Sequence, residues 1–127
     1  MKLWIDDLRE APDGYIWCKS VNEAKESIVE HEERIKNLSE KYNRAFECNL
    51  SYYVEQIRRA IYYNTIELID IDHDAGDYAC DGGDYIKLLD WLEELGRNYP
   101  IRIHSQNPVG VENMRRIIER NGWREVR

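Results

Sequence analysis

Three clusters of ionisable and polar side chains each follow directly after a short apolar stretch of this sequence. The clusters are Asp6 and Asp7; Asp72, His73 and Asp74; and His104, Ser105 and Asn107. Grouped carboxylate oxygens are the ligands that Mg²⁺ or Mn²⁺ prefers in proteins. Histidine changes its protonation state near neutral pH and therefore serves as a general acid or base. Together these residue types indicate a metal-assisted reaction at a phosphate ester, with the metal polarising phosphoryl oxygens or activating water.

The apolar stretches before the clusters predict parallel strands that end at one edge of a sheet. Ile66–Ile71 is short, apolar and rich in β-branched residues, which is typical of a central strand buried on both faces. Charged groups belong at the end of such a strand, because inside it they would be unpaired. In open α/β sheets, ligands bind just beyond the carboxyl ends of the strands. We therefore expect the three clusters to meet at that edge.

Carboxylates from two neighbouring strands would approach one another at this edge. Asp6, Asp7, Asp72 and Asp74 would then form one acidic group. Like charges at short range need a cation between them, or some of them must be protonated. We expect these four residues to bind Mg²⁺ or Mn²⁺. The alternative is that Asp6 and Asp7 are loop carboxylates with Arg9 as an ion-pair partner.

The predicted elements alternate between strands and helices. The strands are Lys2–Ile5, Tyr15–Lys19, Ile66–Ile71, Ile101–Ile103 and a final edge strand at Trp123–Val126. The helices begin near Val21, Ser51, Asp84 and Pro108. Only about nine residues separate the first two strands, which is short for a crossover with a full helix. Asn107 is a good N-cap and Pro108 a good first helical residue, so a phosphate-attracting helix N-terminus opens beside His104.

Two consecutive helices between parallel strands pose a geometric problem, because one helix alone carries the chain from one sheet edge to the other. The first predicted helix is roughly 33 Å long and the second roughly 20 Å. The first should therefore overshoot the sheet and the second should return. We expect a helical hairpin, residues 29–60, that protrudes from the sheet end opposite the carboxylates and serves as a partner surface or a homodimer contact.

Length and composition bound the class of protein. The 127 residues predict one domain, residues 1–127, and no segment reads as a membrane span or a signal peptide, so we expect a cytoplasmic protein without membrane contact. The three cysteines have no disulfide or zinc spacing. A net charge of −7 argues against broad coating of nucleic acid, but it leaves room for one nucleotide or one RNA end.

The stretches LWIDDLREAPDGYIW, DIDHDAGDYACDGGDYI and IRIHSQNPVGVENM resemble the cyclic-phosphate processing receiver domain, a divergent branch of the response-regulator receivers. The resemblance implies a flavodoxin-like parallel sheet of order 2-1-3-4-5, flanked by helices and here carrying the inserted hairpin. It also implies metal-dependent processing of cyclic phosphates on nucleotides or RNA ends. An ordinary receiver has a lysine after its last strand, and no lysine stands near Arg127 here.

We therefore expect a metal-dependent phosphodiesterase that opens a cyclic phosphate on a nucleotide or an RNA end. Its expected residues fall into three roles. They are Asp6, Asp7, Asp72 and Asp74 for the metal; His104, His73 and Asp72 for catalysis, the two histidines by proton transfer; and Arg9, Ser105 and Asn107 for the phosphate.

Three alternatives stay open at this point. The chain is a binder that sequesters a cyclic nucleotide without hydrolysis, a receiver phosphorylated on Asp72, or a degenerate receiver whose hairpin serves as a protein-interaction module.

Overall fold

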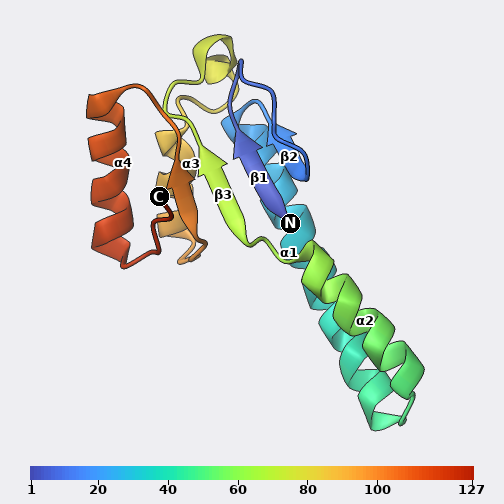
Figure 1. Cartoon of the computed structure of the whole chain (residues 1–127). Helices are drawn as coiled ribbons and strands as arrows, with labels where there is room; N and C mark the ends of the chain where they lie inside the picture. Colours follow the sequence, from blue (N-terminus) through green and yellow to red (C-terminus); the bar gives the residue numbers. More distant parts are fainter.

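A parallel sheet of four strands forms the centre of the computed structural model, which describes all residues from Met1 to Arg127 (Figure 1). The strands are β1 (Lys2–Ile5), β2 (Tyr15–Cys18), β3 (Leu68–Ile71) and β4 (Ile101–Ile103). Their order is β2-β1-β3-β4 and every pair is parallel. The predicted α/β class and the order of these four strands are therefore confirmed.

The fifth strand predicted at Trp123–Val126 is wrong. Only one isolated parallel bridge, between Ile101 and Glu125, joins this segment to the sheet. The neighbouring strand β4 has just three residues, so it offers little backbone to pair with. Trp123 is buried in the core directly after Gly122, whose φ of 66° ends the preceding helix. The chain thus meets the sheet edge at a single point.

Four α-helices and one 3₁₀ turn complete the fold. They are α1 (Val21–Glu47), α2 (Ser51–Asn64), the 3₁₀ turn Gly76–Cys80, α3 (Ile86–Glu94) and α4 (Pro108–Asn121). The Ser20 side chain caps α1 by accepting the N–H of Glu23, and the Asn107 side chain caps α4 by accepting the N–H of Gly110. None of these helices is both long enough and apolar enough to cross a membrane.

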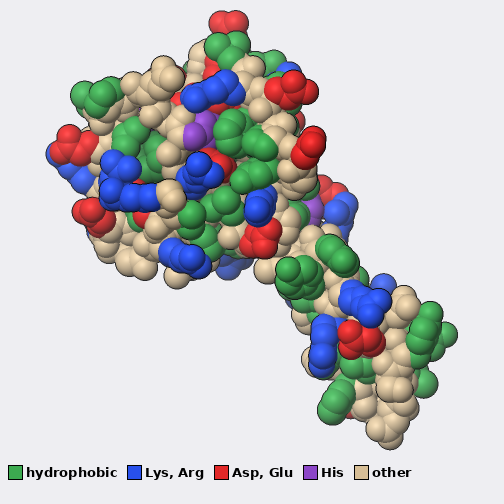
Figure 2. Space-filling view, in the orientation of Figure 1, with side chains coloured by type: hydrophobic (Ala, Val, Ile, Leu, Met, Phe, Trp, Pro, Cys, Tyr) green, Lys and Arg blue, Asp and Glu red, His purple; other side chains and the backbone are tan.

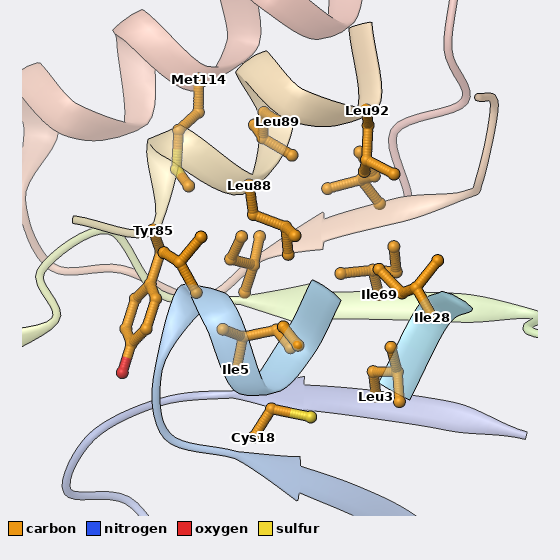
Figure 3. Close-up of a cluster of buried hydrophobic side chains, with 14 of the residues drawn as sticks. Leu3, Ile5, Cys18, Ile28, Ile69, Tyr85, Leu88, Leu89, Leu92 and Met114 are labelled. Carbon is orange, nitrogen blue, oxygen red and sulfur yellow. The ribbon is translucent and has the colours of Figure 1, made fainter. Parts of the chain in front are cut away.

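One hydrophobic core lies between the sheet and the helices (Figure 3). Leu3 and Ile5 of β1 point into it, as do Ile69 and Ile71 of β3, and it includes buried residues of α1, α3 and α4. Side chains alternate along a strand, so the residues between these point to the other face of the sheet. No residue of that other face belongs to the core.

The second face of the sheet carries polar and aromatic side chains instead of helices. Trp4, Asp70 and Arg102 lie there in one row across β1, β3 and β4. We predicted a central strand buried on both faces. All of β3 is buried, but on this second face it is covered by side chains and not by a helix. No helix covers this face because the short connection between β1 and β2 contains none.

Helices α1 and α2 form a hairpin that extends well beyond the sheet (Figure 1). The first turns of α1 bury Val21, Ala24 and Ile28 in the core, and the rest of the helix runs past the sheet. The hairpin leaves the sheet at the end opposite the carboxyl ends of the strands. The carboxyl ends of the strands therefore remain accessible.

Candidate functional site

A polar pocket of about 440 Å³ opens at the carboxyl ends of β1, β3 and β4. Leu8 is its single hydrophobic lining residue. The full lining is Asp6, Asp7, Leu8, Arg9, Asp72, Asp74, Ser105, Gln106 and Asn107. Every predicted site residue except the two histidines lines this pocket. The clusters that lie far apart in the sequence are thus brought together at the predicted edge.

Asp6 is the most heavily engaged carboxylate of the site. It is 1% exposed, and its Oδ1 accepts the backbone N–H groups of Leu8 at 2.9 Å and Arg9 at 2.7 Å. Its Oδ2 lies 3.0 Å from both Arg9 Nε and His104 Nε2. Burial by itself would raise the pKa of Asp6, but these hydrogen bonds and the guanidinium outweigh it and hold the pKa below its usual value. Asp6 is therefore held as an anion.

Arg9 bridges the two strand ends. Its Nε pairs with Asp6, and its Nη2 lies 3.2 Å from Asp72 Oδ2 and donates to the carbonyl of His104 at 3.0 Å. The side chain is about half exposed, so it borders both the carboxylates and the solvent. The sequence left two roles open for Arg9. The structure shows Arg9 in ion pairs with Asp6 and Asp72, and its role in phosphate binding remains a prediction.

His104 is held on three sides. Its Nδ1 lies 2.6 Å from Asp70 Oδ1, its Nε2 faces Asp6, and its ring stacks on Trp4 with centroids 3.8 Å apart and an interplanar angle of 3°. Such contacts fix the orientation of the ring and direct Nε2 toward a residue that lines the pocket. His104 itself does not line the pocket, and it reaches it through Asp6.

Asp70 is the site residue that the sequence reasoning missed. It lies inside β3 and is 1% exposed, with Arg102 Nη1 at 3.8 Å as a second, weaker partner besides His104. A carboxylate in a buried strand needs a partner, because an unpaired charge there is costly. The signal was present, since Asp70 interrupts an otherwise apolar run.

His73 lies on the other side of the site, under the first turn of α4. Its Nδ1 is 2.9 Å from Asp74 Oδ1. The ring fills the space beside Gly110 so closely that a Cβ at that glycine would come within 2.4 Å of the imidazole Cγ. His73 is therefore packed against α4, and its ring contacts the pocket lining only through Asp74 and Asn107.

Ser105 and Asn107 shape the N-terminus of α4. Ser105 Oγ accepts the N–H of Asn107 at 3.1 Å, and Asn107 Oδ1 accepts the N–H of Gly110 at 3.0 Å. The Asn107 amide also donates to Asp74 at 3.3 Å. Both residues line the pocket, and the helix N-terminus that they organise favours negative charge nearby.

Asp7 carries the least compensated charge in the pocket. Partial burial raises its pKa, and the nearby carboxylates of Asp6, Asp72 and Asp77 raise it further. Gly76, at the start of the 3₁₀ turn, lets this turn approach Asp7 closely, because a Cβ at Gly76 would lie 2.3 Å from Asp7 Oδ2. A carboxylate crowded by other carboxylates is the group that a bound cation would relieve most.

The donor atoms fit a divalent cation. Asp6, Asp72 and His104 each offer one ligand atom, and these atoms all lie within 4.8 Å of one another. Asp7 lines the same pocket, whereas the Asp74 carboxylate is turned to His73 and Asn107. Oxygen ligands with one imidazole suit Mn²⁺, and the oxygens alone suit Mg²⁺. In the present arrangement the Arg9 guanidinium supplies positive charge to the same oxygens.

The sheet order and the aspartates that follow β1 and β3 define a receiver-like α/β protein. The chain belongs to the family of the cyclic-phosphate processing receiver domain, whose model matches residues 1–39 and 43–120. This range contains all four strands and every candidate site residue, so the resemblance seen in the sequence is confirmed. No curated protein and no solved structure matches the chain.

Proposed function

We propose that this protein is a metal-dependent phosphodiesterase that opens a cyclic phosphate on a nucleotide or an RNA end. One observation carries the proposal: a carboxylate oxygen each of Asp6 and Asp72 and a ring nitrogen of His104 lie within 4.8 Å of one another at the carboxyl ends of the strands, so that metal-binding acids and a proton-transferring histidine share one site. Membership in a family associated with cyclic-phosphate processing supports the choice of substrate.

The metal would be Mg²⁺ or Mn²⁺, held by Asp6, Asp7 and Asp72. When bound, such an ion lowers the charge on phosphoryl oxygens and the pKa of a water molecule. The raised pKa of Asp7 supports this assignment, because its crowded carboxylate gains most from a cation. Asp74 holds His73 and Asn107, which makes it the weakest of the four predicted ligands.

Hydrolysis adds a water oxygen to phosphorus and breaks one of the two ester bonds of the ring. The water loses a proton, and the released sugar oxygen gains one. We assign this transfer to His104 acting through the pocket-lining Asp6, because Asp70 binds Nδ1 and Nε2 lies 3.0 Å from Asp6 Oδ2. His73 is less suited, since its ring is packed beside Gly110.

The anionic oxygens of the phosphate would be held at the rim of the pocket. Arg9 contributes a half-exposed guanidinium, and Ser105 and Asn107 contribute polar side chains at the N-terminus of α4. A guanidinium and a helix N-terminus both favour a phosphate group. In this proposal Arg9 turns from Asp72 to the phosphate when the substrate binds.

One observation favours a second candidate function, sequestration of a cyclic nucleotide without hydrolysis. Arg9 already neutralises Asp6 and Asp72 and leaves part of its side chain at the solvent. A phosphate could therefore bind at Arg9 and the α4 terminus with no metal present. This reading needs the same phosphate contacts but no attacking water.

The test is ³¹P NMR of the protein with Mg²⁺ or Mn²⁺ and a panel of cyclic mononucleotides, cyclic dinucleotides and RNA ends. Ring opening that stops on chelation and in His104→Gln establishes the phosphodiesterase. Glutamine is preferred to alanine, because it keeps a polar group near the buried Asp70. A shifted signal without turnover supports sequestration, and no effect on any signal rejects both functions. Circular dichroism of the variant controls for unfolding.

A further inference from the structure

Helix α2 presents an outer face of large aromatic side chains to the solvent. None of its residues is buried, although it packs along α1. Its four tyrosines are exposed, Tyr52 by 69%, Tyr53 by 58%, Tyr62 by 70% and Tyr63 by 72%. Figure 2 shows hydrophobic and basic side chains together on the visible face of the hairpin. Exposed aromatic groups of this density mark an interaction surface.

The inner and outer faces of α2 follow separate helical stripes. Val54, Ile57 and Ile61 recur at spacings of three and four and are partly buried against α1. A second stripe, which is exposed throughout, recurs at spacings of four, three and four. It consists of Tyr52, Gln56, Arg59 and Tyr63. This is the heptad spacing by which one helix packs along another.

The outer stripe is complementary to itself when two copies of α2 run antiparallel. The segment 52–63 reads YYVEQIRRAIYY, with a pair of tyrosines at either end. Pairing about its midpoint places Tyr52 of one copy opposite Tyr63 of the other, and Gln56 opposite Arg59. A twofold axis repeats every such contact, which is the pattern of an isologous interface.

The charges of α2 fit the same arrangement. Within one chain the Glu55 carboxylate lies 3.8 Å from Arg58 and 3.7 Å from Arg59, so both contacts are long. In the antiparallel pair, Arg59 of the second copy is one residue from the position opposite Glu55. Each copy then supplies one acid and one base to the other. Opposite charges placed in this way select the partner and its register.

We propose that a second copy of this chain packs antiparallel on the outer face of α2, about a twofold axis between Ile57 and Arg58. The interface joins two hairpins into a four-helix arrangement. The hairpin leaves the sheet at the end opposite the pocket, so both pockets stay open in the dimer (Figure 1). This dimer is independent of the function proposed above.

Cysteine cross-linking tests the register. The background carries Cys48→Ser and Cys80→Ser, which removes the two exposed thiols and keeps the buried Cys18. A mixture of Tyr52→Cys and Tyr63→Cys proteins should form a disulfide-linked dimer, whereas neither variant alone should. Linkage of Tyr52→Cys to itself would instead show a parallel pair, and no linkage in the mixture would overturn the interface.

Sedimentation over a range of concentrations tests the dimer without any cysteine. We expect a reversible dimer that Arg59→Glu weakens by about tenfold, because two ion pairs become two like-charge contacts. The double variant Glu55→Arg, Arg59→Glu should recover the dimer, since the charges are exchanged on both copies. Arg116→Glu, an exposed site on α4, is the matched control. A wild-type chain that stays monomeric, or a double variant without recovery, contradicts the proposal.

Discussion

The Nδ1 atom of His104 lies 2.6 Å from a carboxylate oxygen of Asp70, at the centre of the row that crosses the open face of the sheet. Trp4 stacks on the imidazole and Asp6 faces its Nε2, so the ring has no freedom to turn. The two ring nitrogens therefore have different partners. Asp70 belongs to the strand interior, and Asp6 belongs to the pocket.

Replacing Asp70 with asparagine should loosen this arrangement. The amide keeps the size of the side chain but loses the charge that orients Nδ1–H. We expect hydrolysis to fall by about 10- to 100-fold, the range seen when a carboxylate that orients a histidine is removed. The ¹⁵N shifts of His104 should change as well, and they can be measured even if the chain is only a binder.

The control for Asp70→Asn is Arg102→Gln. Arg102 is the other partner of Asp70, but it is half exposed and 3.8 Å away. Its loss should leave the ¹⁵N shifts of His104 close to those of the wild type. Unchanged His104 shifts in Asp70→Asn would show that the carboxylate does not hold the ring.

Arg9→Gln tests whether the guanidinium competes with a metal ion. Arg9 pairs with one oxygen each of Asp6 and Asp72, two of the three residues whose donor atoms converge. Removing a positive charge this close to a cation site should tighten Mn²⁺ binding by about tenfold, because like charges at ~4 Å repel by about 1–4 kcal/mol near a protein surface.

Titration calorimetry with Mn²⁺ measures the change, with Arg116→Gln as a remote control. Affinity that falls or stays equal in Arg9→Gln would mean that the guanidinium and the cation do not share these oxygens. Phosphate binding provides a second measurement. It should weaken in Arg9→Gln, since the same side chain is proposed to hold the anion.

Much of this site could be predicted from the sequence because parallel strands end at one edge. Once Lys2–Ile5 and Ile101–Ile103 are identified as strands, the residues after them must lie close together. Asp70 could not be placed by this logic, because it lies before the strand end. Its role depends on the ring of His104, which reaches back over the sheet face.

The absence of a fifth strand and the orientation of His73 could not be predicted from sequence patterns, for a different reason. Trp123–Val126 has the composition of a strand, but pairing depends on how much of β4 is available, and β4 offers only Ile101. His73 stands between two aspartates, as a catalytic histidine would. Its packing under Gly110 depends on where α4 begins in space.

Asp6 and Asp7 are neighbours whose pKa values are shifted in opposite directions. The pKa of Asp7 is raised in the folded protein. Its contribution to the free energy of unfolding is therefore fully present below the pKa that Asp7 has in the unfolded chain, and it is lost as the pH rises through the pKa in the folded protein. Ionised Asp7 therefore costs stability at neutral pH. We expect Asp7→Asn to raise the melting temperature by about 2–4 °C in a chelator.

The same variant should respond less than the wild type to added Mg²⁺, because the cation relieves the repulsion that Asp7→Asn has already removed. Thermal unfolding with and without the metal measures both effects. A wild-type chain that Mg²⁺ does not stabilise beyond Asp7→Asn would exclude Asp7 as a ligand.

Asp6→Asn should change the stability of the fold in the opposite direction from Asp7→Asn. The pKa of Asp6 is lowered, so its contribution is present above the unfolded value and is lost as the pH falls through the folded value. At neutral pH the variant should be less stable, and the difference from the wild type should shrink in acid. Unfolding by denaturant at several pH values measures this; a difference that grows in acid would contradict the assignment.

Gly110→Ala tests whether His73 is a packing residue. Alanine normally stabilises a helix by about 1 kcal/mol relative to glycine. Here its Cβ would come within 2.4 Å of the His73 ring, and overpacking of this kind costs about 1–3 kcal/mol. We expect a net loss of stability of about 1 kcal/mol, measured by denaturant unfolding.

The double variant separates the two effects. With His73→Ala in place, the clash is absent, and Gly110→Ala should become stabilising by up to about 1 kcal/mol. If hydrolysis is found, His73→Ala should also retain most of it, because the ring contacts Asp74 and α4 and, unlike that of His104, does not contact Asp6. Additive effects of the two substitutions on stability would show that the ring moves away freely. Loss of turnover in His73→Ala at unchanged stability would restore His73 as a catalytic histidine.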